Sequence, residues 1–300
     1  MLNFDKKSRQ IVAACAALIL ASAASAASTS NRVIYGTDDR RDLFESSNSA
    51  LHLELARSTA IMMPKTNLTK VAGTDTFSLP TDTFGAQQHL CSSEPFIDQP
   101  APGMCSGFLV GEDLFVTAGH CVEDEDFCAG IALIFGYGYE SQGRDLSSVS
   151  GDDVFYCKSI VARLQNPGLA EDFAVIKLDR AVVGREPLKI RRHGAIATGD
   201  GVTVIGHPSG LPTKITSGGN VRSNAASLPY FVTNLDTYGG NSGSAVFNTT
   251  TGEVEGILVR GESDFVRNGD CQVSNKCSET GCRGEDVTKA SVFAAHVPQL

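Results

Sequence analysis

Residues 105–121 read CSGFLVGEDLFVTAGHC, with two short apolar runs on either side of a polar turn. The runs 108–110 and 114–118 have the composition of β-strands, and the Gly-Glu-Asp sequence between them marks a turn. This pattern predicts a β-hairpin whose return strand ends at His120. Similar runs recur between Gly, Pro, Asp and Ser residues at 131–135, 159–164, 173–178, 202–205, 214–217, 230–234, 244–247 and 254–259. Many short strands separated by turns are typical of a β-sandwich or β-barrel.

The composition of the whole chain excludes several classes of protein. Its 300 residues are 42% hydrophobic and 20% charged, which is ordinary for a globular protein and excludes collagen-like and disordered chains. Its net charge of -9 argues against a nucleic-acid partner, whose phosphates would repel it. The stretch up to about residue 88 is polar and poorly patterned. Helical periodicity appears only at 286–297, where a short terminal helix is predicted.

The first residues have the layout of a secretory signal peptide. Lys6, Lys7 and Arg9 precede the apolar run 11–20, which is too short to span a bilayer comfortably, and Ala24-Ser25-Ala26 supplies a signal peptidase site. We place the signal peptide at residues 1–26. An N-terminal membrane anchor is the less favoured alternative. No membrane association is expected after removal of the signal peptide, and the mature protein is predicted to be secreted or periplasmic.

Eight cysteines remain once Cys15 leaves with the signal peptide. An even number in an exported chain indicates disulfides. Zinc is the competing interpretation, but the densest cluster, Cys271, Cys277 and Cys282, contains no C-x-x-C pair and no nearby histidine. No metal and no cofactor are therefore expected.

Three separated segments contain residue types suited to nucleophilic catalysis. His120 follows an apolar run, Asp172 precedes one, and Ser242 lies in the glycine-rich turn GGNSGS at 239–244. The order His, Asp, Ser resembles that of the chymotrypsin-like serine proteases and differs from the orders of subtilisins and α/β-hydrolases. The resemblance implies an all-β fold of two antiparallel six-stranded barrels with a short C-terminal helix. The first barrel would extend to about residue 192 and the second would occupy 193–300.

The same resemblance assigns a role to each residue. His120 would accept the proton of the Ser242 hydroxyl, and Asp172, favoured over Glu171, would fix the imidazole tautomer and stabilise the imidazolium. The amides of Gly240 and Ser242 would form the oxyanion hole. The resemblance also implies a disulfide between Cys105 and Cys121 that clamps the loop of the histidine. A second bridge, Cys128 to Cys157, is an open alternative.

Some features resemble the bacterial glutamyl endopeptidase branch of the family more than animal trypsins. Asn241 stands where trypsins have the aspartate that pairs with the new N-terminal amine, so this ion pair is not available. Residues 33–40, VIYGTDDR, resemble the mature start of the bacterial branch, and Arg32 precedes them. We therefore expect a short propeptide at 27–32 and a peptidase domain at 33–300.

The residues that would bind substrate indicate two different P1 specificities. Asp236, six residues before Ser242, stands where trypsins have the carboxylate that selects Arg or Lys at P1. Thr237 stands where glutamyl endopeptidases bind a substrate carboxylate, although their partner histidine is missing. We favour Arg or Lys over Glu. Val259 and Gly261 are predicted to lie on an exposed strand edge and a pocket mouth that take an extended substrate.

The sequence therefore predicts an exported serine endopeptidase that acts on proteins or peptides through an acyl-enzyme. The alternative is a non-catalytic binding or adhesion module that keeps the protease fold.

Overall fold

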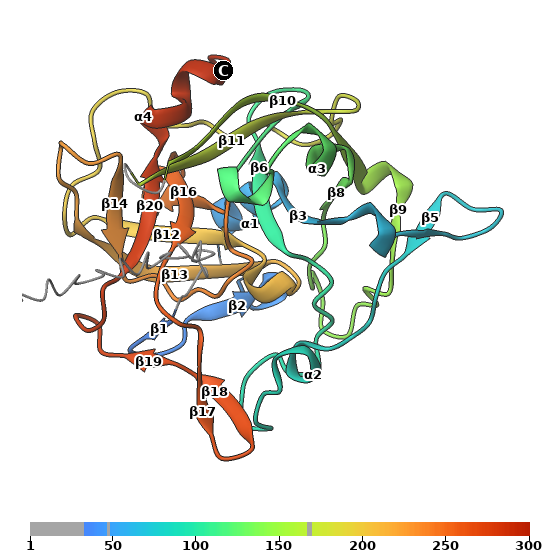
Figure 1. The fold of residues 1–300 in the computed structure, drawn as a ribbon, viewed down its shortest axis with the longest axis horizontal. Helices are drawn as coiled ribbons and strands as arrows, with labels where there is room; N and C mark the ends of the chain where they lie inside the picture. The colour runs from blue at the N-terminus through green and yellow to red at the C-terminus, as the bar shows by residue number, and fades with distance from the viewer. Residues whose placement is uncertain (1–32, 47–48, 167–169) are drawn as a thin grey trace, which may run out of the picture.

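A computed structural model describes residues 33–46, 49–166 and 170–300 (Figure 1). The predicted signal peptide at 1–26 and the propeptide at 27–32 lie outside these residues. Two β-barrels lie side by side (Figure 1) and confirm the predicted fold class. No helix in the described ranges is long and apolar enough to cross a membrane.

The first barrel is a closed ring of six antiparallel strands in the order β10-β11-β7-β6-β3-β8. Its hairpin β6–β7 is the one predicted from residues 105–121. The strands of this barrel are β3 (Thr59–Pro64), β6 (Cys105–Leu109), β7 (Leu114–Thr117), β8 (Ile131–Phe135), β10 (Val154–Asn166) and β11 (Glu171–Leu178).

The second barrel has the order β12-β15-β16-β20-β14-β13 and closes through pairing of β12 with β13. A strand from the N-terminal segment, β2 (Arg40–Asp42), pairs with β13 at the outside of the ring. The strands of the ring are β12 (Gly201–Gly206), β13 (Lys214–Ser223), β14 (Tyr230–Thr233), β15 (Ala245–Asn248), β16 (Val254–Arg260) and β20 (Glu285–Lys289).

The structure revises two expectations about secondary structure, although the predicted short C-terminal helix is present. The stretch before residue 88 contains a barrel strand, β3 (Thr59–Pro64), which is buried between β6 and β8, and its pairing with these remote strands places it in the barrel. The predicted helix at 286–297 begins later, at α4 (Ala290–Phe293). Residues Glu285–Lys289 form β20, because pairing with β14 and β16 overrides their weak helical pattern.

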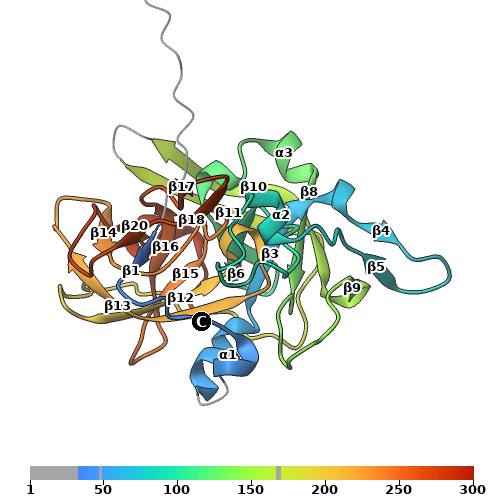
Figure 2. The ribbon, with the colours of Figure 1, turned by 90° about the horizontal axis from the view of Figure 1, so that it is seen from below.

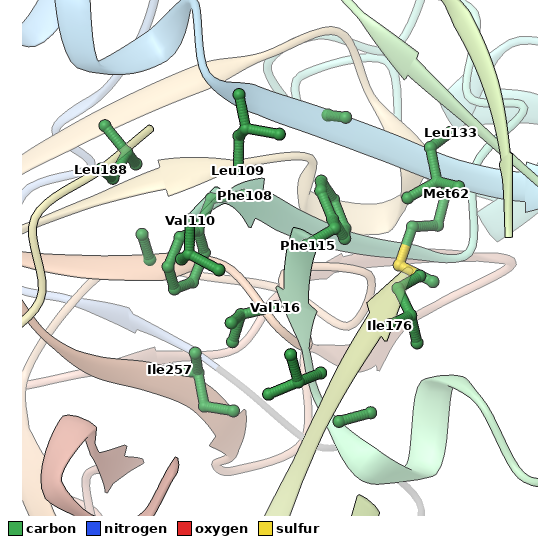
Figure 3. Packing of buried hydrophobic residues seen from close by; sticks show 14 of the residues in the cluster. Met62, Phe108, Leu109, Val110, Phe115, Val116, Leu133, Ile176, Leu188 and Ile257 are labelled. Atoms are coloured by element: carbon green, nitrogen blue, oxygen red, sulfur yellow. The ribbon is translucent and has the colours of Figure 1, made fainter. Parts of the chain in front are cut away.

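Buried apolar side chains form a core that continues from one barrel into the other. In the first barrel, Phe108 of β6 pairs with Val116 of β7, and Leu109 pairs with Phe115 (Figure 3). The same cluster includes Ile257 of β16 in the second barrel (Figure 3). Burial of each such side chain contributes roughly 1.5–3 kcal/mol relative to exposure, so the shared core fixes the relation of the two barrels.

Shorter strands and helices lie outside the two barrels. The sheet of β4, β5 and β9 projects from the side of the first barrel (Figure 2). The additional strands are β1 (Ile34–Tyr35), β4 (Thr69–Lys70), β5 (Thr76–Ser78), β9 (Ser148–Ser150), β17 (Phe265–Asn268), β18 (Cys271–Ser274) and β19 (Lys276–Cys277). The short helices are η1 (Leu43–Ser46), α1 (Ala50–Ala56), η2 (Lys65–Asn67), α2 (Phe84–Gln88), η3 (Gly119–Cys121), α3 (Glu125–Ala129), η4 (Gly151–Asp153), η5 (Pro208–Gly210) and η6 (Ala294–His296).

Four disulfides join the eight cysteines that follow the predicted signal peptide. Two lie in the first barrel, Cys105–Cys121 and Cys128–Cys157. Cys91–Cys271 ties the segment after α2 to the hairpin β17–β18, and Cys277–Cys282 closes a small loop. The sequence left these last two pairings open.

Candidate active site

His120 and Asp172 are brought together within the first barrel. His120 lies in η3, directly after β7, and Asp172 lies near the start of β11, which pairs with β7. The Asp172 Oδ2 atom is 2.7 Å from Nδ1 of His120, and Oδ1 accepts the backbone N–H of His120 at 3.1 Å. Because Asp172 is only 5% exposed, this two-point contact fixes the histidine relative to β11.

The residue before the histidine must be glycine for this contact to form. A Cβ atom at Gly119 would collide with the carbonyl oxygens of Leu164 and Phe173. These two residues face each other in the pairing of β10 with β11. The turn of His120 therefore packs directly on the backbone of the strands that carry Asp172.

Ser242 lies in the turn between β14 and β15 of the second barrel, and this turn rests on the first barrel. Its carbonyl oxygen accepts the backbone N–H of Ser106 at 2.9 Å and lies 3.7 Å from Sγ of Cys121, the neighbour of His120. Gly243 has a φ of +86°, and a Cβ there would collide with the Ser106 carbonyl. A glycine is thus required for the serine turn to approach the hairpin β6–β7.

Hydrogen bonds also fix the residues around the predicted oxyanion donors. The carbonyl of Gly240, whose φ is +83°, accepts the Ser106 hydroxyl at 2.7 Å. Asn241 is buried, its N–H donates to the Tyr238 carbonyl at 3.2 Å, and its Oδ1 accepts the Ser244 hydroxyl at 3.1 Å. The amide side chain is therefore part of the turn itself.

The cleft between the barrels opens beside His120 and Asp172. A cavity of about 220 Å³ there is lined by these two residues and, from the second barrel, by Tyr230, Arg260 and Asp286. Arg260 donates to the Ala170 carbonyl at 3.2 Å across the cleft. This contact between the barrels was not predicted from the sequence, since no local pattern links residues 170 and 260.

Asp236 does not have the open position that the sequence suggested. It is 3% exposed, and its two oxygens accept the backbone N–H groups of Tyr35 at 2.6 Å and Asp39 at 3.0 Å. Burial raises the pKa of Asp236 to about 6. In this structure the carboxylate binds backbone amides of the N-terminal segment 33–42.

A buried carboxylate that sequence reasoning missed, Glu285 of β20, lies against Thr237. The Thr237 hydroxyl donates to Glu285 Oε2 at 3.3 Å, and the Tyr35 hydroxyl donates to Oε1 at 3.4 Å. A Cβ atom at Gly261 would collide with the same carboxylate. Two residues predicted to bind substrate, Thr237 and Gly261, therefore meet at Glu285.

Val259 differs from the prediction of an exposed strand edge. Its side chain is fully buried, and it forms a bulge between Leu258 and Arg260 in the pairing of β16 with β20. It contributes to the core that supports the cleft.

One grouping of metal-binding residue types lies at the site. His120 has the sulfurs of Cys105 and Cys121 near its ring nitrogens, all within 4.8 Å. These sulfurs are joined to each other, so neither offers the thiolate that a metal would need.

Two antiparallel barrels with this histidine, aspartate and serine turn at their junction define the chymotrypsin-like class of protein. The model of the trypsin-like peptidase domain matches residues 105–257, half of the chain. The chain therefore belongs to the trypsin-like peptidase family and is a serine endopeptidase, with proteins or peptides as its substrates.

Similar solved structures are distant from this chain. A Glu endopeptidase in complex with MPD is 18% identical, with a TM-score of 0.49, and the match covers 88% of this chain and 97% of that one. A serine endoprotease from Yersinia pestis is 17% identical, with a TM-score of 0.46 over 82% of this chain and 63% of that one. These values are too low to transfer specificity. No curated protein matches the chain in sequence.

Proposed function

We propose that the protein is an exported endopeptidase that cleaves peptide bonds through an acyl-enzyme formed on Ser242. The two-point contact between Asp172 and His120 carries the proposal, because it orients an imidazole beside the serine turn. The serine carbonyl lies against Cys121, the next residue after that histidine, which supports the inclusion of Ser242.

In this mechanism the Ser242 hydroxyl oxygen attacks the carbonyl carbon while Nε2 of His120 accepts its proton. Asp172, bound to Nδ1, stabilises the imidazolium that results. The amides of Gly240 and Ser242 stabilise the oxyanion. His120 then delivers the proton to the leaving amine as the C–N bond breaks, and water repeats the sequence on the ester to release the acid and regenerate the serine.

A fluorophosphonate probe tests the proposal, because it reacts with an activated serine. The secreted, processed protein is expected to be labelled at Ser242, and both labelling and peptide hydrolysis are expected to disappear in Ser242→Ala. Ser223→Ala, at an exposed serine of β13, is the matched control. A correctly processed protein that neither reacts with the probe nor cleaves peptides would instead be a binding or adhesion module.

For the P1 side chain we propose a preference for Arg or Lys over Glu. The buried carboxylate of Glu285 supports it, since it contacts the Thr237 hydroxyl. A glutamate at P1 would meet a like charge beside Thr237, whereas a cation would be attracted.

Digestion of a peptide library measures this preference directly. We expect cleavage after Arg or Lys, and Glu285→Gln is expected to lower the ratio of basic to acidic cleavage. A sharp preference for Glu in the unaltered enzyme would contradict this specificity and leave the catalytic proposal intact.

We also propose export by a signal peptide at 1–26 and processing after Arg32. The four disulfides support passage through an oxidising compartment. N-terminal sequencing of the secreted protein should give Val33; a start at Ala27 or Ser28 would contradict the propeptide.

A further inference from the structure

The N-terminal segment 33–42 contains a buried cation close to the start of the serine turn. The Arg40 side chain is fully buried, although arginine is rarely buried without partners. Its Nε donates to Asp38 Oδ1 at 2.9 Å and its Nη2 to Asp38 Oδ2 at 2.6 Å. The same Nη2 donates to the Tyr238 hydroxyl at 2.9 Å, and the guanidinium lies 3.9 Å from the centre of the Tyr238 ring.

Tyr238 is held on its other side as well. Its hydroxyl bonds to the Ser274 hydroxyl, which donates to Glu94. Its ring packs 4.8 Å from that of Phe265 and 5.9 Å from that of Phe84. Tyr238 is therefore fixed by three segments that are remote in sequence: 33–42, the region 84–94 and the hairpin β17–β18.

The position of Tyr238 makes it the anchor of the serine turn. Its carbonyl accepts the N–H of Asn241, which closes a turn around Gly239 and Gly240. Glycines leave the backbone many conformations, so a turn of this composition needs a fixed starting point to hold its amides in one direction. Asn241 has no charge and cannot anchor the turn through an ion pair.

We propose that Arg40 is a positioning residue, which fixes Tyr238 and through it the amides of Gly240 and Ser242 that bind the oxyanion. The inference depends on the proposed function only for its catalytic consequence. Arg40 does not touch substrate. Its guanidinium combines a stacked face and a directed N–H, and both contacts act on the same tyrosine.

Two variants remove the contact in different ways. Tyr238→Phe keeps the ring and removes the hydroxyl that both Arg40 and Ser274 bind. Arg40→Met keeps much of the buried volume and removes the charge and the donors. The matched control is Lys214→Met, which breaks the buried contact of Lys214 with Asp42 at the other end of β2. The partners of Lys214 are Asp42, Gln99 and the rings of Phe96 and Tyr139, of which Phe96 also lies 5.4 Å from the Arg40 guanidinium.

We expect Arg40→Met and Tyr238→Phe to lower kcat and the rate of fluorophosphonate labelling in parallel, each roughly tenfold, with little change in KM. Lys214→Met is expected to lower Tm without this loss, when all proteins are assayed well below their unfolding temperatures. Amide hydrogen exchange across 238–244 is expected to rise in the first two variants only.

The outcomes separate this inference from the proposed function. If the unaltered protein has no activity, the proposed function fails, while hydrogen exchange still decides whether Arg40 orders the turn. If kcat and exchange in Tyr238→Phe match the unaltered protein, or if Lys214→Met lowers kcat as much as Arg40→Met does, Arg40 has no positioning role. Tyr238→Phe decides the matter should Arg40→Met fail to fold.

Discussion

The two halves of the candidate active site are supported in different ways. His120 and Asp172 are held by neighbouring strands of one barrel, through β7, β10 and β11 and the disulfide Cys105–Cys121. The serine turn is held by parts of the chain that are remote in sequence, including Arg40 and the hairpin β17–β18. The chemical groups of a site can therefore lie in local motifs while the support of one half depends on long-range packing.

The largest expected effect lies in the locally supported half. Asp172→Asn should lower kcat by about 10⁴-fold, because an amide N–H facing Nδ1 of His120 favours the tautomer whose Nε2 cannot accept the serine proton. Peptide hydrolysis measures the loss, and Tm should change little because Asn keeps the shape. Glu171→Gln at the adjacent position is the control. An equal loss in both variants would mean that Asp172 has no special role.

The parts of the molecule that could be predicted from the sequence follow the same division. The hairpin at 105–121 and the later apolar runs predicted most of the barrel strands, because apolar runs bounded by turn residues are local signals. The order of His120, Asp172 and Ser242 predicted the family, which the matching family model confirms. The roles of these three residues stay predictions.

What the sequence did not reveal depends on remote partners. Asp286 lies at the start of the segment predicted to be helical, yet it is buried in the strand β20, where Arg260 and Arg283 pair with it. The sequence predicted that Asp236 selects the P1 side chain, but its carboxylate oxygens accept backbone amides some 200 positions earlier in the chain. Neither the arginines that pair with Asp286 nor the amides that Asp236 binds could be predicted from the neighbouring sequence.

A smaller effect should come from the disulfide that supports the serine half. Replacing Cys91 and Cys271 by serine frees the hairpin that ends at Ser274, a partner of Tyr238. We expect the free energy of unfolding to fall by about 2–4 kcal/mol and kcat to fall as well.

The comparison variant replaces Cys128 and Cys157, which join α3 to β10 in the first barrel. It should lose comparable stability in denaturant unfolding while keeping kcat. Equal kcat values for the two double variants would show that the serine turn does not depend on its remote support.

The smallest expected effect is a change in pH dependence at the contact between the N-terminal segment and Asp236. Burial, and then the charge of Asp236, raise the pKa of Asp39 to about 8, from a value of 3.8 in the absence of these contacts. Between these values the folded protein holds more protons than the unfolded chain, so the contribution to stability is present at low pH and is lost as pH rises toward 8. Asp38 adds to the repulsion and Arg41 opposes it.

Asp39→Asn keeps a neutral side chain at every pH and should therefore make Tm fall less between pH 6 and 8 than it does in the unaltered protein. Comparing the two proteins cancels the titrating groups that do not contact Asp39, including His207 and Lys214, whose pKa values burial lowers to about 3 and 8. Asp270→Asn, at an exposed turn, should leave the pH profile of Tm unchanged. Asp39 contacts Asp236, which precedes the serine turn in the chain. If the pH profile of Tm in Asp39→Asn matched that of the unaltered protein, the N-terminal segment would add no pH-dependent support to the serine half of the site.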